Sequence, residues 1–201
     1  MPRPTPLTAW MRRSSEFLID VWKHHQNSRD YVVIAARRRS RWHEIPLKLD
    51  SLISLPRRFK QYPREDWDLY FCPNAFRQPT RRSQFASPTP FSWCDLDDGD
   101  ASNFSPQANI IWETSPGRLQ ALFIWDKYLK PQVSETYSRA LTDMAEGDSN
   151  GWSVTKLLRI PHTINHKPEY DEPIVRLTKV CWRPQSKRLG HPFHNRSLNR
   201  D

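Results

Sequence analysis

The chain has 201 residues, of which 37% are hydrophobic and 12% aromatic, and it carries a formal net charge of +9. This length fits one domain or a compact pair of subdomains, and the basic charge favours a polyanionic partner. The sequence has no apolar run approaching a bilayer span and no signal-peptide core at its start, so we expect a cytoplasmic protein without a membrane partner. The three cysteines (Cys72, Cys94 and Cys181) are scattered and never in C-x-x-C spacing, which indicates a reducing compartment without a zinc site or disulfide frame.

The first third of the chain alternates between helical and strand patterns. Apolar residues at helical spacing predict an amphipathic helix that begins at Pro6, and the His24-His25 pair at its end is expected at the surface. Two β-rich runs separated by a basic turn predict a hairpin, and Pro56 is expected to stop a short helix. The expected elements are a helix over 6–27, strands over 31–38 and 42–49, a helix over 51–59 and a strand over 67–72.

The connection over residues 73–90 is rich in Pro, Ser and Arg. Three arginines, Arg77, Arg81 and Arg82, are interleaved with aromatic residues in this segment. The pattern is typical of a surface that contacts DNA phosphates and stacks bases, and it is equally typical of a solvated loop held down by its aromatic side chains. The sequence leaves both interpretations open.

An apolar run, FSWCDLD (91–97), ends in two carboxylates one residue apart. Side chains alternate across a strand, so Asp95 and Asp97 are expected on one face, with Leu96 in the core. Two adjacent carboxylates repel each other, and a divalent cation between them relieves the repulsion. Hard oxygen ligands suit Mg²⁺ or Mn²⁺. The alternative is that LDDGD only begins an acidic, solvated loop.

The segment 109–126 predicts a strand, a tight turn and a second strand. The turn Ser115-Pro116-Gly117 places glycine at a positive-φ position, and its N–H groups, together with Ser115 and Arg118, are placed to hold phosphate. A helix is expected over 130–148, ending at Gly147.

The segment 152–168 carries Arg159, His162, His166 and Lys167 in close succession. Basic and amide donors at this density indicate a bound anion. A last strand is expected over 173–182. The polar tail is interpreted as disordered or as a linker, and its His191 and His194 as unrelated to metal binding.

Three blocks in this order, 91–98, 112–125 and 147–167, together resemble the archaeo-eukaryotic primase superfamily. The similarity is to RepB-like primase-polymerase domains of plasmid and phage replication proteins, and it covers most of 30–180. It implies an α+β fold with an RRM-like antiparallel catalytic sheet, flanking helices and an additional N-terminal α/β unit. The implied organisation is a helix over 1–29, a catalytic domain over 30–182 and a tail over 183–201.

The resemblance also implies an activity: template-directed nucleotidyl transfer with two divalent cations, Mg²⁺ or Mn²⁺. The implied partners are a single-stranded DNA template with its primer, nucleoside triphosphates and a helicase domain or subunit. The implied setting is a bacterial, archaeal or virus-infected cell in which the gene is carried by a plasmid or phage.

Single residues match the family's motifs. Asp95 and Asp97 match its acidic metal motif, and Gln120 takes the slot in which many members carry a histidine beside the triphosphate. Arg159, Asn165 and Lys167 match a segment that approaches the nucleotide's phosphates. The resemblance therefore implies a nucleotide site made of Ser115, Gly117, Arg118, Gln120, Arg159, Asn165 and Lys167.

Two departures from the family pattern stand out. His162 replaces the glycine of a Pro-Gly-Thr turn, so that turn lacks glycine's backbone freedom. Ser153 stands where relatives often place a third acidic ligand, and the nearest acid, Asp148, is our candidate for that role. A catalytically weak initiator module that only binds DNA is the first alternative. A DxD glycosyltransferase conflicts with the basic charge, and an RNA-binding module lacks an RNP-like aromatic motif.

Overall fold

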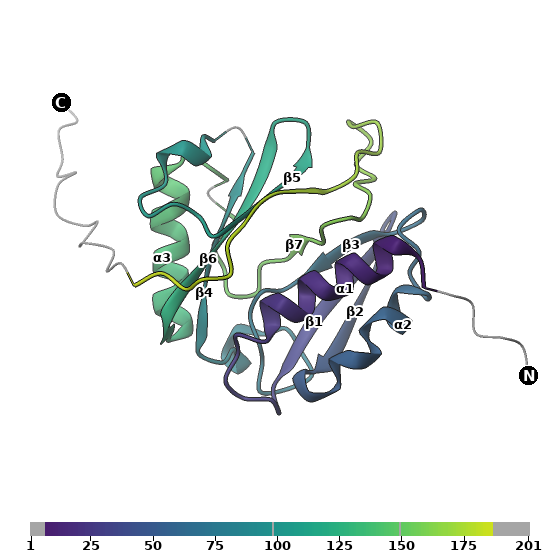
Figure 1. Ribbon diagram of the computed structural model, residues 1–201, viewed down its shortest axis with the longest axis horizontal. Coiled ribbons are helices and arrows are strands. Elements are labelled where there is room, and N and C mark those ends of the chain that lie inside the picture. Colours follow the sequence, from purple (N-terminus) through teal and green to yellow (C-terminus); the bar gives the residue numbers. More distant parts are fainter. Residues whose placement is uncertain (1–6, 98, 149, 187–201) are drawn as a thin grey trace, which may run out of the picture.

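Two four-stranded antiparallel sheets form the frame of the molecule (Figure 1). The computed structural model describes residues 7–97, 99–148 and 150–186. The strand order is β2-β1-β3-β7 in the first sheet and β4-β6-β5-β8 in the second. Within the described residues no helix is long and apolar enough to cross a membrane. The elements are α1 (Ala9–Trp22), β1 (Tyr31–Arg38), β2 (Arg41–Lys48), η1 (Leu49–Ser54), α2 (Leu55–Phe59), β3 (Asp68–Phe71), η2 (Ser83–Phe85), β4 (Thr89–Leu96), η3 (Ala101–Asn103), β5 (Ile110–Ser115), β6 (Arg118–Leu129), α3 (Pro131–Met144), β7 (Leu158–Arg159) and β8 (Arg176–Val180).

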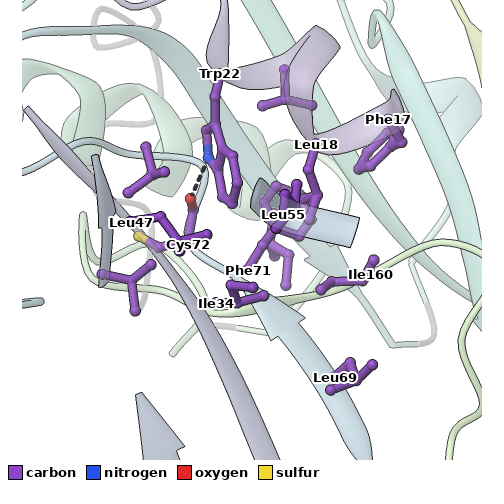
Figure 2. Close-up of a cluster of buried hydrophobic side chains, with 14 of the residues drawn as sticks. Phe17, Leu18, Trp22, Ile34, Leu47, Leu55, Leu69, Phe71, Cys72 and Ile160 are labelled. Carbon is purple, nitrogen blue, oxygen red and sulfur yellow. Dashed lines mark hydrogen bonds between the residues drawn. The ribbon is translucent and has the colours of Figure 1, made fainter. Parts of the chain in front are cut away.

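Helices α1 and α2 cover one face of the first sheet. Because side chains alternate along a strand, Ile34 of β1 and Leu69 of β3 both point to this face, where they join Leu18 and Leu55 of the helices (Figure 2). The Trp22 indole is fully buried and donates to the carbonyl of Cys72 at 3.0 Å. The predicted α+β class is confirmed, and α1 shares one core with the first sheet.

The remaining helix, α3, packs on the edge strand β4 of the second sheet. An edge strand leaves backbone groups unpaired, and two serines of α3 pair with them. Ser138 accepts a hydrogen bond from the Trp93 amide at 3.1 Å, and Ser134 donates to the Phe91 carbonyl at 2.7 Å. These small side chains let α3 approach closely and fix the strand that leads to the predicted acidic pair.

Several boundaries differ from the sequence prediction. Pro56 lies at the start of α2 rather than stopping a helix, because proline's missing N–H is not needed in the first turn. Past the end of α3, the left-handed position is taken by Glu146 at φ 55°, not by Gly147. Gly147 is required for space, since a Cβ there would lie 2.6 Å from the Asp95 carbonyl. The predicted His191 and His194 lie outside the described residues.

His25 is half-buried rather than fully exposed at the surface as predicted. Its ring lies 5.4 Å from the ring of Phe91, and its Nε2 is 2.9 Å from the Pro73 carbonyl. Its Nδ1 is buried without a partner among the described residues. Burial lowers the pKa of His25 from 6.5 to about 4, and the contact with Pro73 opposes this only in part. The imidazole is therefore neutral in the fold at physiological pH.

Acid should destabilise the protein through His25. Between pH 6.5 and about 4 the unfolded chain binds a proton that the folded chain does not. The free energy of unfolding should therefore fall with pH in this window, by up to about 3 kcal/mol. Urea unfolding at several pH values checks this against His25→Gln, which should lose that part of the acid sensitivity. A pH-independent difference between the two proteins would contradict the prediction.

Candidate active site

A cavity of about 260 Å³ lies where the two sheets meet. Its walls come from β3 and β7 of the first sheet, from β4, β5 and β6 of the second, and from the loops that follow α3 and β7. The cavity brings together most of the site residues predicted from the sequence: Asp95, Asp97, Asp148, Ser115, Arg118, Gln120, Arg159, Asn165 and Lys167. Lys156 and Tyr70 also line it, and the sequence did not single them out.

The acidic pair stands at the end of β4, and each carboxylate has a cation beside it. Lys156 Nζ lies 2.8 Å from Asp95 Oδ2, and Arg118 Nη1 lies 2.7 Å from Asp97 Oδ1. The repulsion expected from the sequence is therefore relieved in this structure by side chains of the protein itself. Lys156 is the cation that the sequence analysis missed.

Asp148 lies next to the acidic pair. Its amide donates to the Asp95 carbonyl at 2.9 Å, and its Oδ2 lies 3.8 Å from Lys156 Nζ. Ser153, which stands in the matched slot for a third acid, instead contacts Thr155 at 2.9 Å. The loop after α3 thus places Asp148 as a third carboxylate near Asp95, although Asp148 precedes Ser153, the position that matches the third acid of relatives.

The carboxylates have the chemistry of a magnesium or manganese site. Oxygens of Asp95 and Asp148 converge on the Lys156 ammonium, which stands in for a cation, whereas Asp97 pairs with Arg118. Among residues 7–97, 99–148 and 150–186, no three or more His, Cys, Asp or Glu form a group that could hold a metal ion. Mg²⁺ is usually bound by one or two carboxylates together with water and substrate phosphates, so the donor set fits a cation that arrives with its substrate.

Gln120 connects the two sheets at the back of the cavity. It is buried at 6% exposure, and its Nε2 donates to Asp95 Oδ1 at 3.2 Å. Its Oε1 accepts from the Trp112 indole at 3.1 Å and from the Arg159 amide at 2.9 Å. Gln120 therefore orients Asp95 relative to β7.

Arg159 is buried at 4% exposure and is held by a partner that the sequence did not indicate. Its Nη1 lies 2.6 Å from Asp68 Oδ1, and its guanidinium lies 4.9 Å from the centre of the Tyr70 ring. Burial raises the pKa of Tyr70, and the charge of Arg159 opposes this shift. Arg159 Nη2 is buried and has no partner in the described part of the chain, so one strong donor remains available at the cavity.

The predicted anion-binding segment turns around the cavity. His162 adopts φ 70°, the left-handed conformation that glycine would favour, and Arg64 donates to its carbonyl at 2.7 Å. Asn165 donates to the Thr114 carbonyl at 2.9 Å and accepts from the Lys167 amide at 3.2 Å. Asn165 thus shapes the segment, and Lys167 lines the cavity with its ammonium 3.7 Å from Glu169 Oε1.

Some predicted residues lie elsewhere. Gly117 takes φ 76° as the turn requires, but its amide donates to Glu113 and it does not line the cavity. Arg77 holds its own loop through the carbonyls of Gln84 and Ala86, and Arg81 pairs with Glu44. Arg82 is exposed. Contact of these three arginines with DNA stays a prediction.

The fold is that of known primase domains. The primase-polymerase domain of cyanophage S-2L matches with a TM-score of 0.66 and 8% identity over 87% of this chain and 93% of that one. The catalytic domain of primase RepB′, solved with initiator DNA, matches with a TM-score of 0.65 and 15% identity over 87% and 88%. No protein-family model and no curated protein matches the sequence. The similarity in fold expected from the three sequence blocks is confirmed.

Proposed function

We propose that this chain is a RepB-like primase-polymerase that adds nucleotides to a primer on a single-stranded DNA template. One observation carries the proposal: in the primase fold, a single cavity is lined both by carboxylates and by cationic and hydroxyl donors. This distribution fits a metal-bound triphosphate, whose negative phosphates need both a cation and fixed donors.

The acidic wall would hold the metal. Asp95 and Asp97 supply its first oxygens, and Asp148 is the third carboxylate nearby. When bound, Mg²⁺ or Mn²⁺ would lower the pKa of the primer hydroxyl and neutralise charge on the triphosphate. Lys156 competes with any such cation for Asp95, because its ammonium lies on the same carboxylate. Gln120 keeps Asp95 in place throughout.

The cationic and hydroxyl donors of the cavity, here called the phosphate wall, would bind the phosphates. Ser115 Oγ and Arg159 Nη2 are buried and unpartnered within the residues described, which is costly unless a ligand accepts from them. Arg118 and Lys167 add positive charge at the same cavity. Asn165 acts through its hold on Lys167 rather than by direct contact.

Lys167→Ala tests the phosphate wall. A charge-assisted contact contributes about 1.5–3 kcal/mol, so the substitution should raise the KM for nucleotide about 10- to 100-fold and change kcat little. The Lys167 ammonium is half-exposed and 3.7 Å from Glu169, so stability should hardly change. Calorimetric titration of a nonhydrolysable triphosphate with Mg²⁺ measures the loss directly. Lys179→Ala, an exposed lysine of β8, is the matched control, and unchanged affinity in Lys167→Ala would contradict the assignment.

A second function, that of a DNA-binding initiator module without catalysis, is favoured by two features. The Lys156 ammonium already occupies an oxygen of Asp95, and Gln120 replaces the histidine found in many relatives. A protein whose own lysine occupies the cation position beside Asp95 would bind DNA without catalysing nucleotide incorporation. Nucleotide incorporation separates the two candidates.

A further inference from the structure

An aromatic surface extends from the cavity across the first sheet. Trp42 of β2 is 48% exposed, and its ring centre lies 5.4 Å from that of Tyr70, at an interplanar angle of 35°. Tyr70 lines the cavity. Both rings lie on the sheet face opposite Ile34 and Leu69, because they occupy the alternate positions in the strand register. The surface is therefore on the side of the sheet that α1 and α2 leave uncovered.

The two rings meet across a strand. β1 lies between β2 and β3, so the rings start from backbones about 10 Å apart. Ala35, which is in register with Tyr70, has a side chain small enough for both rings to lean over it, and it is buried at 0% exposure. The small side chain of Ala35 thus explains how an exposed tryptophan reaches the edge of the active site.

Positive charge borders this aromatic surface. The guanidinium of Arg37 lies 5.5 Å from the centre of the Trp42 ring. Arg37, Arg38 and Arg39 line a neighbouring cavity of about 560 Å³, which shares Lys167 with the active-site cavity. The acidic residues of this second cavity are all paired: Glu65 with Arg64, Asp66 with Arg38, Asp68 with Arg159 and Glu169 with Lys167.

Two cations at this surface stay available. Of the residues that the structure describes, no acidic side chain forms an ion pair with Arg37 or Arg39. Arg37 Nε donates to the carbonyl of Arg39, which fixes the end of the hairpin. The surface therefore combines one exposed aromatic face with uncompensated positive charge, next to the proposed nucleotide site.

We propose that Trp42, Tyr70 and Arg37–Arg39, here called the Trp42 platform, bind the single-stranded template where it passes the active site. One unpaired base stacks on the exposed face of Trp42, and the arginines contact the adjacent phosphates. Duplex DNA does not fit this role, because its bases already stack on one another. The inference rests on the proposed function, whose template it places on residues other than Arg77, Arg81 and Arg82.

Binding of labelled oligo-dT, followed by fluorescence anisotropy, tests the platform without catalysis. Trp42→Ala should weaken binding about 5- to 100-fold, whereas Trp42→Phe, which keeps a stacking ring, should lose much less. Changing Arg37 and Arg39 together to Ala should lower the slope of log affinity against log salt by about 1.4, because each phosphate contact contributes about 0.7. Arg57 and Arg58, exposed on α2 beyond the opposite face of the sheet, form the matched pair of controls and should leave the slope unchanged.

The outcomes distinguish the inference from the proposed function. Wild-type protein that fails to bind oligo-dT would overturn both. Wild-type binding that persists in Trp42→Ala, or that falls equally in the Arg57 and Arg58 control, would overturn the platform alone. Trp42→Ala should keep the wild-type affinity for a nonhydrolysable triphosphate, which shows that the variant remains folded and that only template contact is lost.

Discussion

Replacing Asp95 and Asp97 together by Asn should reduce nucleotide incorporation by at least about 10³-fold. The amides are poorer ligands for a hard cation, and removing one fixed group that stabilises transition-state charge already costs about 10²–10³ in rate. Primer extension on a single-stranded template measures the loss. Asp126→Asn, an exposed aspartate at the end of β6, is the matched control and should extend normally.

The same double variant should melt close to the wild-type temperature. The pairs of Asp95 with Lys156 and of Asp97 with Arg118 are partly solvated, and such pairs contribute at most about 1 kcal/mol. Because these cations already relieve the repulsion between the carboxylates, removing the carboxylates brings no gain in stability. Activity near wild type in the folded double variant would contradict the metal assignment.

Breaking the buried pair between Arg159 and Asp68 should have the largest effect on stability. Their side chains are only 5% and 10% exposed, so Arg159→Ala leaves a buried carboxylate without its partner. We expect the free energy of unfolding to fall by about 3–5 kcal/mol, and Asp68→Ala should cost a similar amount. Urea denaturation measures both single variants. Arg159→Met combined with Asp68→Leu should lose much less than the sum, because neither charge is then left unpaired.

This coupling changes how Arg159 must be tested. A weaker nucleotide affinity in Arg159→Ala could come from the loss of Nη2 or from local unfolding. Lys167→Ala avoids this ambiguity because it probes the phosphate wall alone. If Arg159→Ala is as stable as the wild type, the guanidinium is not held in the buried pair with Asp68. Nη2 is then not fixed at the cavity by that pair.

Local patterns in the sequence predicted the frame well. The first hairpin, β4, the turn between β5 and β6, and α3 follow from period and turn chemistry over short spans. The three blocks also predicted nine residues that the fold brings to one cavity. Local signals are sufficient here because Asp95 and Asp97 lie two residues apart at the end of β4, and Arg159 and Lys167 share one bent segment.

Contacts between distant segments could not be predicted in this way. Asp68 and Arg159 are 91 residues apart and meet only because β3 pairs with β7. Asp68 did leave a signal, since an acid inside an apolar strand must find a partner when buried. Lys156 left no such signal in the sequence, because a single lysine among polar and apolar residues does not indicate a partner. His25 was misjudged because its burial depends on Phe91 and Pro73, which are distant from it in the sequence.

Template-directed incorporation by the wild-type protein tests the central claim most directly. Single-stranded templates that differ in one position are offered with a primer, each nucleotide in turn, and Mg²⁺ or Mn²⁺. We predict that only the complementary nucleotide is added, and that a chelator abolishes the addition. Tight binding of the template without incorporation in either metal would contradict this prediction and would favour the DNA-binding module.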